Sequence, residues 1–227
     1  MREEEEGYFG KAFIGNWVED KTSFLFFSQP SSGLISSLLE NRSDLELIDE
    51  YRFTYEQWQG GGLKPIKVEN ILITPPWEKS DRAEGEIRII LDPGVVFGTG
   101  LHPSTRDCIR ALTCLRKETL FENVLDLGTG TGVLALVAMR LGAKRVLAVD
   151  LNPLCVKTAR KNIAYNRLED GIRVECGRAE DFIHEPADLL AANIHYGAMS
   201  SLSQLVLSKM KVTPPVCCGI NECLSGI

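Results

Sequence analysis

Glycines at every second position, Gly128, Gly130 and Gly132, separate a short apolar run from a run of helix-forming residues. The apolar run at 124–127 predicts a buried strand, and the run at 132–141 predicts a helix. Glycine has no Cβ and adopts φ values that other residues avoid, so a turn of this kind suits close approach of the backbone to another group. We therefore expect the chain to fold around this strand, turn and helix. A glycine-rich turn that holds no ligand is the alternative.

The spacing of the glycines and their acidic neighbours indicate which ligand the turn would hold. Dinucleotide-binding turns follow G-x-G-x-x-G and receive a diphosphate at a helix N-terminus, whereas here the pattern is G-x-G-x-G with Asp126 two residues earlier. A carboxylate at that place would repel a diphosphate and suits a ligand with an ammonium group or hydroxyls. Asp150, at the end of the next apolar run, can accept hydrogen bonds from both hydroxyls of a ribose. These features predict S-adenosylmethionine (AdoMet) as the cofactor and fit a nicotinamide dinucleotide poorly.

From about residue 95 onward, predicted strands and helices alternate along the chain. Strands are expected at 124–127, 146–150, 172–176 and 188–192, with helices at 104–116, 132–141, 153–166 and 197–209. This alternation predicts an α/β fold with a doubly wound, mostly parallel Rossmann-like sheet over 95–227, whose ligands bind at the carboxyl ends of the strands.

Two further regions precede the alternating part. Residues 1–57 predict a small α+β N-terminal domain, with strands within 8–18, at 23–28 and at 46–55, and a helix at 33–40. Residues 58–94 are expected to form a linker and an entry segment, with strands at 67–74 and 85–91.

The composition is that of an ordinary globular protein, with 44% hydrophobic and 25% charged residues. No apolar run is long enough to cross a bilayer, and the acidic start of the chain is unlike a signal peptide. Three widely spaced histidines predict no metal site. A net charge of −6 argues against direct nucleic-acid binding and would suit a basic protein partner. Seven cysteines without a C-x-x-C pair suit a reducing cytoplasm, and four of them are expected in the core: Cys108, Cys114, Cys155 and Cys176.

The run at 91–105, LDPGVVFGTGLHPST, resembles the L-D-P-G-x-x-F-G-T-G-x-H-P-T-T run of the PrmA family, the methyltransferases of large-subunit ribosomal protein L-eleven. Residues 64–66, 73–78 and 188–194 are similar to other parts of that family, so the resemblance covers about residues 58–200. It implies a methyltransferase sheet of the Rossmann-like class, AdoMet as cofactor, and transfer of a methyl group to an amine of a ribosomal protein.

The loop at 97–103 is expected to cover the bound cofactor. Phe97 would offer an apolar wall, Gly100 would allow close approach, and Thr99 and Thr105 would offer hydroxyls. The alternative role for Thr105 is to cap the helix that follows. His102 is expected to hold the loop through its imidazole rather than to act as a general base.

The segment at 188–196 is expected to carry the chemistry, because it resembles the family's D-L-V-x-A-N-I/L segment. The side-chain oxygen of Asn193, with a backbone carbonyl of Asn193 or Ile194, would accept hydrogen bonds from an amine and aim its lone pair at the methyl group. Tyr196 departs from the family and gives N-x-x-Y, which is similar to the N-P-P-Y corner of methyltransferases that act on amide or exocyclic nitrogens. The alternative is a tyrosine that closes the core. The expected catalytic residues are Asn193, Ile194 and Tyr196.

The resemblance also places the adenine ring after the strand at 172–176. The backbone amide after Ala179 and a carboxylate of Glu180 or Asp181 would contact its nitrogen edge, although a capped turn is the alternative. The full set of residues expected to bind AdoMet is Phe97, Thr99, Gly100, His102, Thr105, Asp126, Gly128, Thr129, Gly130, Gly132, Asp150, Leu151, Ala179, Glu180 and Asn193.

Two departures from the family leave the substrate open. The 57 residues before Trp58 are fewer than the family's N-terminal recognition domain contains. At the other end, 223–227 resembles the family's fifth strand, 216–220 competes for that place, and the hairpin that completes the sheet is missing. We expect an AdoMet-dependent protein N-methyltransferase. The alternatives are an enzyme for another protein or a small-molecule amine, and a catalytically weak AdoMet-binding module.

Overall fold

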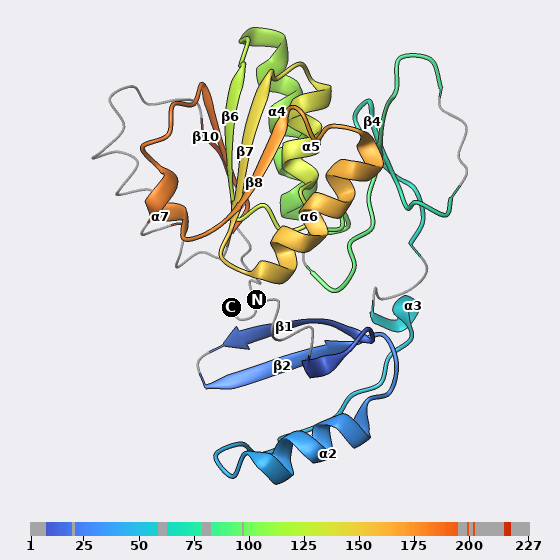
Figure 1. The fold of residues 1–227 in the computed structure, drawn as a ribbon. Coiled ribbons are helices and arrows are strands. Elements are labelled where there is room, and N and C mark those ends of the chain that lie inside the picture. The colour runs from blue at the N-terminus through green and yellow to red at the C-terminus, as the bar shows by residue number, and fades with distance from the viewer. Residues whose placement is uncertain are drawn as a thin grey trace, which may run out of the picture. The chain divides into compact units, whose positions relative to one another are not determined.

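The computed structural model describes residues 8–19, 21–58, 63–78, 83–96, 98–194, 199, 202 and 216–218. The chain divides into two compact units, Met1–Leu63 and Lys64–Ile227 (Figure 1). The second unit therefore takes in most of the segment at 58–94. A role of the first unit in recognising a substrate stays a prediction.

The first unit is built on a hairpin followed by helices. β1 (Phe13–Glu19) pairs antiparallel with β2 (Thr22–Phe27), and α2 (Ser32–Asn41) and α3 (Tyr55–Trp58) follow. Aromatic packing supports the hairpin, because the ring centroid of Phe13 lies 4.6 Å from that of Phe9 and 5.4 Å from that of Phe27. The predicted strand at 23–28 and the predicted helix at 33–40 are confirmed. Of the β segment predicted at 8–18, the part from Phe13 onward is confirmed, whereas Tyr8 and Phe9 are helical.

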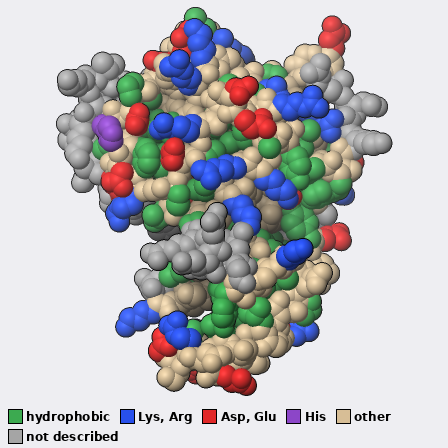
Figure 2. Space-filling model, in the orientation of Figure 1, with side chains coloured by type: hydrophobic (Ala, Val, Ile, Leu, Met, Phe, Trp, Pro, Cys, Tyr) green, Lys and Arg blue, Asp and Glu red, His purple; other side chains and the backbone are tan. Residues whose placement is uncertain are grey.

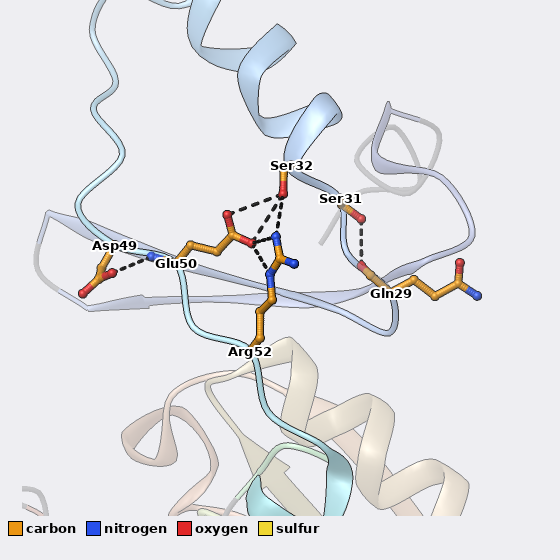
Figure 3. Close-up of polar contacts among 6 residues, drawn as sticks. All are labelled: Gln29, Ser31, Ser32, Asp49, Glu50 and Arg52. Carbon is orange, nitrogen blue, oxygen red and sulfur yellow. Dashed lines mark hydrogen bonds and ion pairs between the residues drawn. The ribbon is translucent and has the colours of Figure 1, made fainter.

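The predicted strand at 46–55 is wrong. Residues 45–54 form no strand ladder, and side-chain contacts hold this segment to the start of α2 instead (Figure 3). Glu50 accepts hydrogen bonds from the Ser32 hydroxyl at 3.4 Å and from Arg52 Nε at 2.8 Å. The apolar residues that suggested a strand are exposed rather than buried in a core: Leu45, Leu47, Ile48, Tyr51 and Phe53.

A five-stranded parallel sheet forms the centre of the second unit, in the order β10–β9–β6–β7–β8 (Figure 1). From β6 the chain builds outward to β8 and then returns to place β9 on the other side of β6, so the strand order reverses there. This reversal is the point at which doubly wound sheets bind ligands. The strands are β6 (Asn123–Leu127), β7 (Arg145–Asp150), β8 (Ile172–Cys176), β9 (Leu189–Ala192) and β10 (Val216–Cys218).

Of the two candidates for the outermost strand, the segment at 216–220 supplies β10, which pairs with β9 from Val216 to Cys218. The competing segment at 223–227 lies outside the described residues. Of the helix predicted at 197–209, the structure describes Met199 and Leu202, both helical, and Leu202 is buried.

Side chains alternate between two cores along each strand, as a sheet covered on both faces requires. One face packs against α4 (Pro103–Glu118), α5 (Val133–Arg140) and α6 (Pro153–Asn166), and the other against α7 (Ala179–Phe182), Met199 and Leu202. The first core takes Val124, Val146, Ala148, Val174, Leu189 and Ala191, and the second takes Leu125, Leu127, Val149, Leu190 and Ala192. The predicted doubly wound α/β sheet is confirmed.

A second, three-stranded sheet precedes the main one, in the order β3 (Ile66–Val68), β4 (Ile71–Thr74) and β5 (Ile87–Ile90). The single strand predicted at 67–74 is wrong, because the chain reverses between β3 and β4. Glu69 adopts a left-handed φ of 53° in that turn, which ends the extended run. β4 and β5 pair in parallel.

Two cysteines depart from the expected core placement. Cys108 and Cys155 are buried, whereas Cys114 and Cys176 are exposed. Cys114 occupies the outward side of α4, and Cys176 is the last residue of β8. None of the helices formed by the described residues is both long and apolar enough to cross a membrane. Figure 2 shows basic and acidic side chains interspersed over the viewed face of the second unit.

Candidate cofactor and acceptor site

The glycine-rich turn joins β6 to α5 at the carboxyl edge of the sheet. Gly128, Gly130 and Gly132 have φ values of 72°, 55° and 85°, a region in which side-chain-bearing residues are strained. The backbone amides of Gly128 and Thr129 donate to Val149 O at 2.8 and 3.0 Å, which fixes the turn on the end of β7. The sequence therefore needs glycine at these three positions for backbone geometry.

Gly128 also needs glycine because of its neighbour. A Cβ on this residue would lie 2.1 Å from Cγ2 of Ile194, just beyond β9. The turn after β6 and the segment after β9 thus come into direct contact. Two of the sequence motifs, separated by more than sixty residues, meet at this contact.

Asp126 lies beneath the turn rather than on its surface. Its side chain is 1% exposed, and Oδ2 accepts hydrogen bonds from the Thr129 hydroxyl at 2.6 Å and from the Ala135 amide at 3.2 Å. Oδ1 is buried without a hydrogen-bond partner among the described residues. Burial raises the pKa of Asp126 to about 6, and the nearby Asp150 carboxylate adds to the shift. The carboxylate thus ties the turn to the start of α5.

Asp150 closes the turn from the end of β7. Its Oδ2 accepts from the Gly130 amide at 2.9 Å, and its Oδ1 accepts from the Asn152 amide at 2.9 Å. Burial raises the pKa of the Asp150 carboxyl, against the effect of these backbone hydrogen bonds. The Cys155 thiol also donates to this carboxylate. An ionised carboxylate has about four lone-pair sites, so these three donors leave room for a further hydrogen bond, as from a ribose hydroxyl.

The residues that the sequence suggested for contact with an adenine ring lie along the same edge. Leu151, which follows Asp150, is 66% exposed. The Gly177 amide donates to Asp150 O at 3.0 Å, and α7 begins at Ala179. Glu180 lies 3.5 Å from Arg178 in an ion pair. The structure therefore brings Leu151, Ala179 and Glu180 to the end of β7, where Asp150 stands.

The loop before α4 is fastened at several points. His102 is the N-cap of α4, where its Nδ1 accepts from the Ser104 amide at 3.3 Å. The Thr99 hydroxyl accepts from the Leu101 amide at 3.1 Å. Arg106 Nε donates to Gly100 O at 3.1 Å. His102 therefore holds the start of the helix, and Phe97 lies outside the described residues.

Thr105 and Asn193 contact each other although they come from α4 and from the end of β9. Thr105 is fully buried, and its hydroxyl accepts a hydrogen bond from Asn193 Nδ2 at 3.0 Å. Asn193 Oδ1 is buried without a hydrogen-bond partner among the described residues. Buried acceptors are nearly always paired, so this oxygen is the kind of group that a bound amine would satisfy. Tyr196 lies outside the described residues.

Three buried polar residues to which no sequence motif pointed also belong to this region: Thr131, Asn162 and Asn166. The Thr131 hydroxyl donates to Gly98 O at 2.7 Å, and Asn162 Nδ2 donates to Thr131 O at 2.9 Å. Asn162 and Asn166 are four residues apart on α6, a spacing that places both on one side of the helix. Two asparagines spaced four residues apart, in line with the buried apolar positions of a predicted helix, were the feature of the sequence that could have indicated this contact. Among the described residues, no group of three His, Cys, Asp or Glu side chains is placed to hold a metal ion.

Comparison with known proteins identifies the family. The family model described as ribosomal protein L11 methyltransferase (PrmA) matches residues 5–220. The chain belongs to the PrmA family. A ribosomal protein L11 methyltransferase of Aquifex aeolicus is 39% identical over 167 residues, which cover 73% of this chain and 62% of that protein. A ribosomal protein L11 methyltransferase of Clostridium perfringens is 47% identical over 132 residues, which cover 58% of this chain and 41% of that protein.

A solved structure supports the same assignment. The crystal structure of a ribosomal protein L11 methylase from Lactobacillus delbrueckii subsp. bulgaricus superposes with a TM-score of 0.62 at 30% identity. The match covers 70% of this chain and 81% of that one. The Rossmann-like methyltransferase fold expected from the sequence is therefore that of a PrmA-family protein. The chain spans 41% to 62% of the length of the two curated relatives named above.

Proposed function

We propose that this chain is an AdoMet-dependent protein N-methyltransferase whose acceptor is an amine of a ribosomal protein. One arrangement carries the proposal. The strands β9, β6 and β7 are neighbours, and their carboxyl ends carry Asn193, the glycine-rich turn and Asp150, respectively. On one side of the turn stands an amide oxygen that has no hydrogen-bond partner within the described part of the chain, and on the other side stands a carboxylate.

The residues present fit AdoMet. Asp150 suits the hydroxyls of a ribose, and the bare backbone of Gly128 and Gly130 allows close approach. Leu151 offers an exposed apolar side chain beside Asp150 for an adenine ring. When bound, AdoMet supplies an electrophilic methyl group on a sulfonium. Asp150 and the turn then orient the cofactor, while Asn193 orients the acceptor.

Asn193 would position the acceptor nitrogen. Its Nδ2 donates to the Thr105 hydroxyl, which orients the carboxamide, and its Oδ1, which has no partner among the described residues, can accept a hydrogen bond from an amine N–H. Such a hydrogen bond fixes the direction of the nitrogen lone pair, and alignment is the main contribution a protein makes to this kind of displacement. A lysine or α-amine must first lose a proton, which removal from water favours by lowering the amine pKa.

The methyl acceptor is inferred from the acceptor of the relatives and from the net charge of this chain. The relatives described above are ribosomal protein L11 methyltransferases, and a net charge of −6 suits a basic protein acceptor. A ribosomal-protein acceptor also agrees with the cytoplasmic location and the absence of a membrane association expected from the sequence.

Methyl transfer from labelled AdoMet tests the proposal. The purified chain is incubated with ribosomal protein L11, with L11 whose amines are blocked by acetylation, and with a small amine such as free lysine. We expect label in unmodified L11 only. Transfer to the small amine alone would indicate a different acceptor class, and AdoMet binding without any transfer would indicate a catalytically weak binding module.

Two variants locate the chemistry. Asn193→Ala is expected to lower transfer about 100-fold, as when a key positioning hydrogen bond is removed, while AdoMet affinity measured by calorimetry changes little. Asn123→Ala is the matched control, because Asn123 lies at the opposite end of β6 and donates to Asp188 Oδ2 at 3.2 Å. An equal loss of affinity and transfer in Asn193→Ala would reject the role given to this residue.

A further inference from the structure

A chain of buried hydrogen bonds connects the glycine-rich turn to both ends of the loop at 92–98. On one side, Asn162 Nδ2 donates to Thr131 O at 2.9 Å and to Asp92 O at 3.0 Å, and Asn162 Oδ1 accepts from the Asp92 amide at 2.8 Å. On the other side, the Thr131 hydroxyl donates to Gly98 O at 2.7 Å. Thr131 is therefore the point at which the two ends of the loop are joined.

The contact at Gly98 is close and depends on its conformation. Gly98 has a φ of 109°, and a Cβ on it would lie 2.8 Å from the Thr131 hydroxyl oxygen. A loop segment can approach the threonine this closely only because residue 98 is glycine. The Thr131 side chain thus packs directly against the Gly98 backbone, although the two residues are 33 positions apart in the sequence.

Thr131 itself is shielded from any ligand. Its side chain is 0% exposed, and its hydroxyl proton is committed to Gly98 O. The loop it holds, however, leads directly into Thr99, Gly100 and the capped start of α4. An effect of Thr131 on the site must therefore act through the position of that loop.

We propose that Thr131 is a positioning residue, which holds residues 92–96 and 98–100 in the conformation that binds the cofactor. The inference rests on the proposed AdoMet site, and it adds a residue whose hydroxyl contacts only the protein. Losing the hydroxyl leaves Gly98 O without its buried donor, so the loop gains freedom that cofactor binding must then remove.

The test compares isosteric substitutions at two buried threonines. Thr131→Val keeps the shape and removes the donor, and we expect it to raise the Kd for AdoMet about 5- to 30-fold, the equivalent of one or two net hydrogen bonds. Thr113→Val is the matched control, because the Thr113 hydroxyl is buried and donates at 2.9 Å to Ile109 O within α4. The control is expected to keep the wild-type Kd within about twofold, because Ile109 O retains its intrahelical amide donor.

Hydrogen–deuterium exchange of the ligand-free proteins supplies the second readout. Exchange of a peptide covering 96–102 should be faster in Thr131→Val than in the wild type and unchanged in Thr113→Val. Thr131→Ser, which keeps the hydroxyl, should restore both slow exchange and Kd, and it stands in if Thr131→Val does not fold. Equal effects on Kd in Thr131→Val and Thr113→Val, or no rescue by serine, would overturn the proposal.

The two proposals fail in different ways. If the wild-type chain binds no AdoMet in calorimetry, the proposed function fails, while the exchange comparison still shows whether Thr131 holds the loop. If the wild type binds AdoMet and Thr131→Val binds it equally well with unchanged exchange, only the role of Thr131 fails.

Discussion

The Asn193 carboxamide donates from Nδ2 to the Thr105 hydroxyl over 3.0 Å, while its Oδ1 is buried with no hydrogen-bond partner among the described residues. A carboxamide carries a donor NH2 group on one side and an acceptor oxygen on the other. An acceptor that binds the NH2 group therefore fixes the direction in which the oxygen points. Thr105, which the sequence suggested as a cofactor ligand or a helix cap, here contacts the residue proposed to hold the acceptor.

The first prediction concerns this contact. Thr105→Val removes the oxygen that accepts from Asn193 Nδ2 and allows the carboxamide to rotate. We expect single-turnover methyl transfer to fall about tenfold, the equivalent of one hydrogen bond of about 1.4 kcal/mol. Thr105→Ser keeps the hydroxyl and should transfer at close to the wild-type rate. If the serine variant is as slow as the valine variant, packing rather than the hydroxyl explains the effect.

The second prediction compares AdoMet affinity with protein stability after substitution of either of two aspartates. Asp150→Ala removes the acceptor of the Gly130 and Asn152 amides and a proposed ribose ligand. AdoMet binding should weaken by about 1–3 kcal/mol, as for the loss of hydrogen bonds to a charged group. Isothermal titration calorimetry measures this loss.

Asp188→Ala provides the control for Asp150→Ala. Asp188 Oδ2 likewise accepts two backbone hydrogen bonds, from the Glu122 and Asn123 amides at 2.9 and 2.8 Å, but at the opposite end of the sheet. We expect this variant to lower thermal stability without changing AdoMet affinity. Loss of affinity in both variants would mean that destabilisation alone accounts for the result.

The third prediction follows from the buried carboxylate of Asp126, whose pKa is raised from 3.8 to about 6. Because the folded pKa is above the unfolded one, the folded state retains a proton that the unfolded state releases. The stabilisation is fully present below pH 3.8 and is lost as pH rises through 6. A shift of about two pKa units corresponds to about 3 kcal/mol.

Asp126→Asn tests this sign, since asparagine keeps an acceptor for the Thr129 hydroxyl and does not titrate. Relative to the wild type, the free energy of unfolding of the variant should rise between pH 4 and pH 8, by up to about 3 kcal/mol. Urea unfolding of both ligand-free proteins at several pH values gives the difference. Parallel pH profiles for the two proteins would show that Asp126 does not titrate as described.

The fourth prediction concerns the contact between Gly128 and Ile194. Gly128→Ala adds a Cβ at 2.1 Å from Ile194 Cγ2 on a backbone with a φ of 72°. Gly85→Ala isolates the conformational part, because Gly85 has a φ of 78° and no atom of the described residues lies within 4 Å of its added Cβ. We expect a loss of about 1–2 kcal/mol for Gly85→Ala and about 1–3 kcal/mol more for Gly128→Ala. Thermal or urea unfolding measures both, and equal losses would mean that Ile194 moves aside freely.

The main sheet was predictable from sequence because its signals are local. Apolar runs such as the one at 124–127, glycines at fixed intervals, and prolines at the first turns of α4 and α6 each specify their own segment. The segment at 46–55 shows the limit of such signals. Alternating apolar residues predicted a strand, but a strand forms only where another edge accepts its hydrogen bonds, and side-chain contacts with Ser32 replace them here.

The positions of candidate site residues were predictable where a residue type is uncommon in its local context, such as an aspartate or closely spaced glycines directly after a buried strand. Asp150 at the end of β7 and the glycines after β6 lie together as their positions on neighbouring strands require. The contacts between Thr105 and Asn193 and between Thr131 and Gly98 span 88 and 33 residues, and no periodicity encodes them. They depend on how α4 and the loop before it pack, which only the folded chain specifies.

Asn162 and Asn166 of α6 also bind the backbone at and just after β5. Asn166 donates to Ile90 O at 2.6 Å and accepts from the Ile90 amide at 3.0 Å, and Asn162 engages Asp92 in the same way. Each side chain imitates a peptide group of an adjacent strand along the open border of the three-stranded sheet. A helix thereby occupies the border at which β5 would otherwise recruit a strand from another molecule.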